Sequence, residues 1–167
     1  MTATTTGIVT TSPASASLFY LFNPTAGTND VVVNLGSVSP LSTAFVIWTC
    51  SGVNTASPVH DATEATSTGT AVTLTVPNLV AGDVVVDFMM GDADAALAGE
   101  PSEGASQTVL HKGTESSEIN YGASYQAAAD GGVMSWTLGT SDQWAQQAVA
   151  LTPAASTRRP IPPIIFQ

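Results

Sequence analysis

The residues best suited to covalent chemistry in this chain are two histidines and one cysteine, and they lie far apart in the sequence. His60 is followed by Asp61 in a turn-rich stretch, so this pair could form half of a catalytic triad. His111 precedes Lys112 in a strand-like run. The sequence has no G-x-S-x-G nucleophile elbow, HExxH, CxxC or P-loop. Lone surface histidines are far commoner than catalytic ones, so we expect no enzyme activity.

Cys50 is the single cysteine, so no disulfide can form within the chain. It follows the apolar run AFVIWT, and small thiols in such runs are usually core residues. A catalytic thiol would need a nearby histidine and some exposure. We therefore expect Cys50 to be a buried structural residue.

An acidic stretch offers the carboxylates that calcium prefers, at Asp92, Asp94, Glu100 and Glu103. The spacing does not fit an EF-hand, because Ala96 would occupy position 5 and no glycine follows it. A solvated acidic loop is the simpler interpretation. We expect no metal and no cofactor.

The charge of the chain excludes one class of partner. The 167 residues include 13 acids and 3 bases, which give a formal net charge of −10. Such a body is repelled by nucleic-acid phosphates, so we expect no nucleic-acid binding. No apolar run reaches the roughly 20 residues of a membrane span, and the first residues lack the pattern of a Sec signal. The length predicts one domain.

Short runs rich in valine, isoleucine, threonine and aromatic residues predict an all-β chain. The predicted strands are residues 30–35, 43–50, 71–79, 82–90, 106–113, 117–126, 132–139 and 144–152. The run AFVIW does not alternate with polar residues, so we expect a central strand covered on both faces. The number and spacing of the strands favour an antiparallel β-sandwich of the jelly-roll kind.

Two terminal segments lie outside this strand pattern. Residues 1–17 predict an N-terminal arm or edge strand, residues 18–153 the β-sandwich domain, and residues 154–167 a proline-rich C-terminal arm. The basic and apolar residues of that last arm predict docking onto a neighbouring subunit, with the tail folding back over its own sheet as the alternative. The predicted docking residues are Arg158, Arg159, Pro160, Ile161, Ile164, Ile165 and Phe166.

Three aromatic residues suggest a different function, carbohydrate binding. Tyr121 and Tyr125 are four apart, so on a strand they face the same side. Trp144 stands beside Asp142 and Gln143, whose polar groups could contact a sugar. An exposed aromatic platform at these positions would favour an adhesin.

The order of several short motifs resembles a known β-sandwich domain. The motifs are LFYLFNPTAGT (18–28), SGVNTASP (51–58), AGDVVVD (81–87), SWTL (135–138) and WAQQAVALTP (144–153). This series is similar to a domain of bacterial surface proteins and of tailed-phage virion proteins. The resemblance covers about residues 18–153 and implies a virion or surface setting, with no active site to carry over.

The chain departs from that family at its beginning. The family usually has two or three more strands before the first motif, whereas this chain has only residues 1–17 there. We therefore expect an incomplete sandwich whose open edges are completed by neighbouring subunits. The resulting prediction is a phage capsid decoration protein of the virion, forming a homo-oligomer with a trimer favoured. Its partner would be the major capsid protein or another virion protein, and a tail or fibre module is the alternative.

Overall fold

The computed structural model describes residues 2–3, 9–10, 14–21, 24–28, 30–34, 43–92, 99–115, 118–155 and 165–166. Within these ranges the chain is mostly antiparallel β-sheet, with one short 3₁₀ helix, η1 (Ala128–Asp130), and no α-helix. The prediction of an all-β chain is confirmed. In the same ranges no helix is long and apolar enough to cross a membrane.

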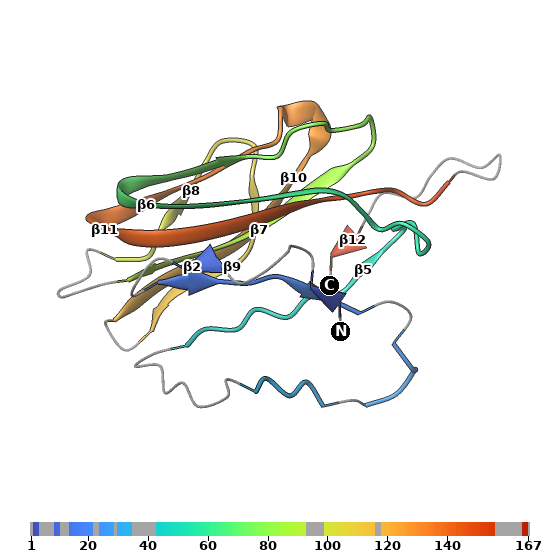
Figure 1. Ribbon diagram of the computed structural model, residues 1–167, viewed down its shortest axis with the longest axis horizontal. Coiled ribbons are helices and arrows are strands. Elements are labelled where there is room, and N and C mark those ends of the chain that lie inside the picture. Colours follow the sequence, from blue (N-terminus) through green and yellow to red (C-terminus); the bar gives the residue numbers. More distant parts are fainter. Residues whose placement is uncertain are drawn as a thin grey trace.

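One large open sheet forms the body of the molecule (Figure 1). Its main strands, in spatial order, are β6 (Val59–Thr75), β11 (Val133–Leu151), β7 (Val84–Asp92), β10 (Ile119–Ala127) and β9 (Thr108–Glu115). A two-residue strand, β8 (Ser102–Glu103), pairs with the first part of β11. All of these neighbours are antiparallel, so β6 and β9 are the edge strands of this order.

Strand β11 unites two segments that the sequence predicts as separate strands. Its register with β6 shifts between Thr137 and Asp142, close to the gap between the two predicted strands at residues 132–139 and 144–152. Gly69 of β6 pairs with Asp142 and has a φ of 148°, a conformation that favours glycine. The prediction of two strands is therefore wrong, because an irregularity inside one long strand absorbs the turn residues.

Strand β7 is covered on both faces, which explains its nearly continuous apolar sequence. Val86 and Phe88 belong to one buried cluster, together with Ala123 of β10 and Val149 of β11. On the other face, Val85 packs with Leu74, Val76 and Met134, and Met89 packs with Val72, Trp136 and Trp144. The bent β6–β11 pair supplies most of this second covering.

The N-terminal residues lie against the first of these faces (Figure 1). Ala16 and Leu18 are buried in its cluster, and the Leu18 backbone N–H donates a 2.8 Å hydrogen bond to Gln147 Oε1 of β11. The paired strands here are two residues long: β1 (Thr2–Ala3) with β4 (Phe19–Tyr20), and β2 (Val9–Thr10) with β3 (Ser15–Ala16).

The segment 43–51 corrects two predictions. Only Cys50 and Ser51, which form β5 (Cys50–Ser51), are paired as a strand. Phe45 is 56% exposed and Ile47 is 70% exposed, whereas Val46 and Trp48 pack against the buried cluster. The prediction of a central strand covered on both faces is therefore wrong, because the segment lies outside the large sheet and has one covered side.

Cys50 is exposed, so the prediction of a buried thiol is also wrong. Partial desolvation by the surrounding chain still raises the pKa of its thiol, which disfavours the reactive thiolate. The predicted strand at residues 30–35 is likewise not formed over residues 30–34, where Val32 is 82% exposed.

The described end of the C-terminal arm pairs with its own chain. Strand β12 (Ile165–Phe166) is antiparallel to β5, with Ile165 opposite Ser51 and Phe166 opposite Cys50. This arrangement corresponds to the fold-back alternative. Five of the predicted docking residues lie outside the described residues: Arg158, Arg159, Pro160, Ile161 and Ile164.

Candidate functional site

His60 is paired with a carboxylate, but not with the neighbour that the sequence suggests. His60 Nδ1 lies 2.8 Å from Asp83 Oδ2, and the Asp83 side chain is buried. The Asp61 carboxylate instead accepts hydrogen bonds from Asn78 Nδ2 and the Ala62 backbone N–H. His60 and Asp61 therefore bind different partners and do not pair with each other.

The Asp83 carboxylate closes a turn in addition to binding His60. The Val80 backbone N–H donates to Asp83 Oδ2 over 2.9 Å, and the Asp83 N–H donates to the Val80 carbonyl over 3.0 Å. Gly82 sits inside this turn with a φ of 96°. This geometry joins the beginning of β6 to the turn before β7, which gives the histidine a structural role.

His111 contacts one of the predicted aromatic residues. Tyr121 Oη lies 3.2 Å from His111 Nε2, and the ring centroids are 5.6 Å apart. Next to His111, Lys112 Nζ forms a 2.8 Å ion pair with Glu103 Oε2, which lowers the pKa of Glu103. These exposed pairs connect β9 to β10 and to β8.

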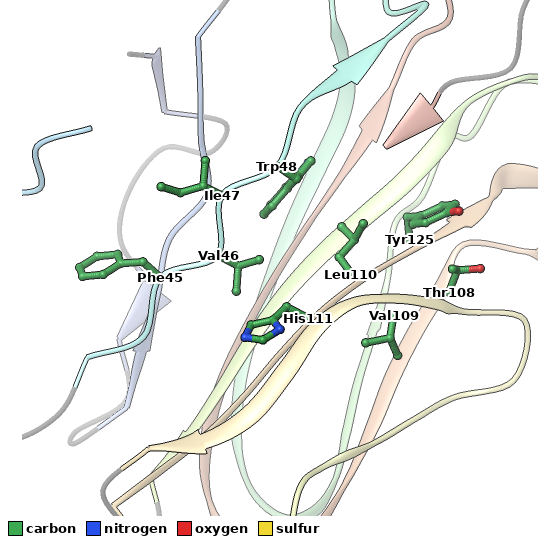
Figure 2. Close-up of a pocket in the computed structure, with 9 residues that line it drawn as sticks. All are labelled: Phe45, Val46, Ile47, Trp48, Thr108, Val109, Leu110, His111 and Tyr125. Carbon is green, nitrogen blue, oxygen red and sulfur yellow. The ribbon is translucent and has the colours of Figure 1, made fainter. Parts of the chain in front are cut away.

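A groove lies between the segment 45–48 and strand β9 (Figure 2). It has a volume of about 580 Å³ and is lined by Phe45, Val46, Ile47, Trp48, Thr108, Val109, Leu110, His111 and Tyr125. Figure 2 shows Val46 and Trp48 pointing toward Leu110 and His111, while Phe45 and Ile47 point to the other side. The groove therefore combines aromatic side chains with a hydroxyl and an imidazole.

The three predicted sugar-contacting residues are not all together. Tyr125 lines the groove. Tyr121 is not one of the lining residues, but it contacts His111, which is. Trp144 is 5% exposed and packs on the opposite face of the sheet with Met89 and Trp136. Phe45 and Trp48 were not predicted as binding residues, because their apolar run suggested a core strand.

Charge and apolar surface are distributed unequally along the chain. Among the 13 acids, Asp30 alone precedes residue 60, so the other 12 lie between Asp61 and Asp142. No basic residue precedes Lys112. Of the nine large hydrophobic side chains that are exposed in the described ranges, seven lie between Phe19 and Ile47. We call residues 14–51 the neutral segment, because Asp30 is its single charged residue.

A polar network that the sequence did not predict is buried under the bent β6–β11 pair. Asp87, which lies in the predicted strand at residues 82–90, has an exposure of 0%. Its Oδ1 accepts hydrogen bonds from the Ser124 backbone N–H and Oγ, at 3.0 and 2.6 Å. Its Oδ2 accepts from Trp136 Nε1 and Gln146 Nε2, both at 2.7 Å.

Burial raises the pKa of Asp87 to about 6, although the hydrogen bonds from Ser124, Trp136 and Gln146 act in the opposite direction. The network continues through Gln107, which donates to Ser124 Oγ and accepts from the Ser135 N–H. It joins β7, β10 and both halves of β11, and its enclosed position indicates a structural function. The signal in the sequence is an acid inside the apolar run VVVDFMM.

The acidic stretch does not form a metal site within the described residues. No group of three or more histidine, cysteine, aspartate or glutamate residues is close enough to hold a metal ion there. Glu103 is paired with Lys112, and Asp94 lies outside the described ranges.

Comparison with known proteins adds no identification. No family model, no curated protein and no solved structure matches the chain. The resemblance to the phage and surface domain therefore stays a prediction. Three of its motifs do supply the buried network, through Asp87, Trp136 and Gln146, so these positions have a structural explanation within this chain.

Proposed function

We propose that this protein is a non-enzymatic structural component of a phage-like particle, in the role of a capsid decoration protein. In this proposal the open sheet and the neutral segment form an antiparallel sandwich of the jelly-roll kind that neighbouring subunits complete. The partners are copies of the same chain, with a trimer favoured, and the major capsid protein or another virion protein.

The observation that carries the proposal is the neutral segment beside an acidic sheet. Phe19, Leu21 and Ile47 each expose more than half of their surface, although they lie in the least charged part of the chain. Exposed apolar side chains, where they gather into one patch, mark interaction sites. Burying one such side chain stabilises a complex by about 1.5–3 kcal/mol before ordering costs. The acidic sheet would then face solvent and keep the particle soluble.

The C-terminal arm supports the same proposal. Two of its residues already pair with β5 through their backbone. The same register can form between two chains if the arm crosses to a neighbour, as in strand exchange. The arm residues that we expect to contact the neighbour are Arg158, Arg159, Pro160, Ile161 and Ile164.

Light scattering after gel filtration tests the proposal. The comparison is between the full chain, at 16.9 kDa per subunit, and a chain that ends at Ala155. We expect the full chain to be an oligomer, with a mass three times that of one chain favoured, and the truncated chain to be folded and to have a lower mass. Two monomers of equal thermal stability would contradict a role of the arm in self-assembly. Two monomers with a less stable truncated form would identify the arm as an intramolecular cover.

A second candidate function is carbohydrate binding, which the aromatic lining of the groove favours. Trp48 and Tyr125 offer ring surfaces, and Thr108 and His111 offer hydrogen-bonding groups. Titration with a glycan panel should then quench tryptophan fluorescence, and Tyr125→Ala should abolish the saturable signal. Absence of saturation with every glycan would argue against this candidate.

A further inference from the structure

Residues 43–48 of the neutral segment have the sequence of a strand, but they pair with no strand among the described residues. Thr43, Ala44, Phe45, Val46, Ile47 and Trp48 receive no backbone hydrogen bond from any described residue. Their side chains nevertheless alternate, with Phe45 and Ile47 outward and Val46 and Trp48 toward the sheet (Figure 2). This alternation is the geometry of an extended strand.

Unpaired backbone in an extended apolar segment is a template for another strand. In the described part of the tail, β12 pairs with the adjoining residues Cys50 and Ser51. No described residue of the chain pairs with the backbone of residues 43–48, so a strand from another molecule can pair there.

We infer that this segment pairs with the same segment of a second copy, antiparallel and about a twofold axis at Val46. In this register Val46 faces the partner copy's position 46, and each Phe45 faces the Ile47 position of the other copy. Each Ala44 likewise faces a Trp48 position. The pairing places a small side chain against a large one on the covered side. On the outer side it places an aromatic side chain against a β-branched one, a kind of cross-strand pair that stabilises sheets.

The charge distribution favours a second copy over an unrelated partner. Two chains of net charge −10 repel each other over most of their surface. Residues 43–50 carry no charge, and Asp30 is the single charged residue before His60. Two copies can therefore meet at this segment without bringing like charges together. A basic partner would be attracted to the acidic sheet instead.

This inference deepens the proposed function by naming one contact between subunits, and it rests on the self-assembly part of that proposal. A twofold contact joins two chains, and it can equally join two trimers within a particle. It does not require the C-terminal arm.

Disulfide trapping tests the register. The background is Cys50→Ser, because the native thiol is exposed. Facing residues of an antiparallel pair have Cα atoms about 4.5–5.5 Å apart, which suits a disulfide. Val46→Cys chains should therefore cross-link to dimers under mild oxidation, at concentrations where the Cys50→Ser parent shows none.

Two further variants act as matched controls. Positions 45 of the two copies would lie about 8 Å apart along the diagonal, as would positions 47, which is too far for a disulfide. Phe45→Cys and Ile47→Cys should thus fail to cross-link separately and should cross-link when the two chains are mixed. Cross-linking of each variant with itself, or none for the mixture, would overturn the register.

Mass measurements separate this inference from the proposed function. Ile47→Lys should abolish the twofold contact, whereas Val80→Lys, at a position 53% exposed and outside the segment, should leave the mass unchanged. If Val46→Cys does not cross-link while the full chain is still an oligomer, the pairing is wrong and self-assembly stands. If the chain is monomeric at every concentration and Val46→Cys does not cross-link, both are wrong.

Discussion

Asp87 gives the sharpest test of how this fold is held together, because it is the fully buried acid at the centre of the network. The informative change is Asp87→Asn, which keeps the shape of the side chain and removes its titration. Asparagine has one acceptor oxygen, so its amide would face donors that now bind a carboxylate oxygen. That mismatch lowers the free energy of unfolding by about 1–3 kcal/mol, independently of pH.

The pH dependence follows from the raised pKa of Asp87. Its pKa rises from 3.8 to about 6 on folding, so the folded state binds more protons than the unfolded state between these values. The stability contribution is therefore complete below pH 3.8 and is lost as the pH rises through 6. At 1.36 kcal/mol for each pKa unit, the total loss is about 3 kcal/mol.

Urea unfolding followed by tryptophan fluorescence measures this effect, since Trp136 contacts the carboxylate. The free energy of unfolding of the parent minus that of Asp87→Asn should fall by about 2–3 kcal/mol between pH 4 and pH 7. Val85→Ala, on the same face of β7, should differ from the parent by the same amount at both pH values. A difference that rises with pH would refute the reasoning, because the donors would then outweigh burial.

Two other predictions concern packing. Gly122→Ala should lower the free energy of unfolding by about 1–3 kcal/mol, because the new Cβ would lie 2.6 Å from the Trp136 ring. Gly91→Ala, whose Cβ would lie 3.1 Å from the flexible end of Leu138, should lower the free energy of unfolding by less in the same urea titration. Equal decreases for the two variants would contradict the packing argument. Gln147→Leu should remove the hydrogen bond to the Leu18 N–H and speed chymotrypsin cleavage at Phe19 and Leu21. An unchanged cleavage rate would show that this bond does not hold the N-terminal residues on the sheet.

The parts of the fold that could be predicted are the strands with local apolar patterns. Residues 82–90, 106–113 and 117–126 correspond closely to β7, β9 and β10. The first half of β6 was missed, because residues 59–70 are polar and rich in threonine, as in a loop. They form a strand because β11 supplies hydrogen-bond partners along their whole length, which local sequence cannot reveal.

The candidate site was less accessible to sequence reasoning. Tyr125 was predicted from its spacing to Tyr121, and both lie on the side of the sheet that carries the groove. Trp144 was assigned to the same group, but its strand face turns it to the opposite side. The face of a residue depends on register, which the irregularity between Thr137 and Asp142 resets within β11.

The two faces of β7 are covered in different ways. On one face, Asp87 receives four hydrogen bonds and fixes the bent β6–β11 pair over the sheet. On the other face, residues 43–48 contribute side chains to the core while their backbone pairs with no described residue. A network of buried polar groups stabilises one arrangement of the sheet, because its hydrogen bonds form only in that arrangement. Apolar contacts, in contrast, can form in several arrangements of a segment. In our proposal a neighbour pairs on the neutral side, and assembly there would leave the polar network undisturbed.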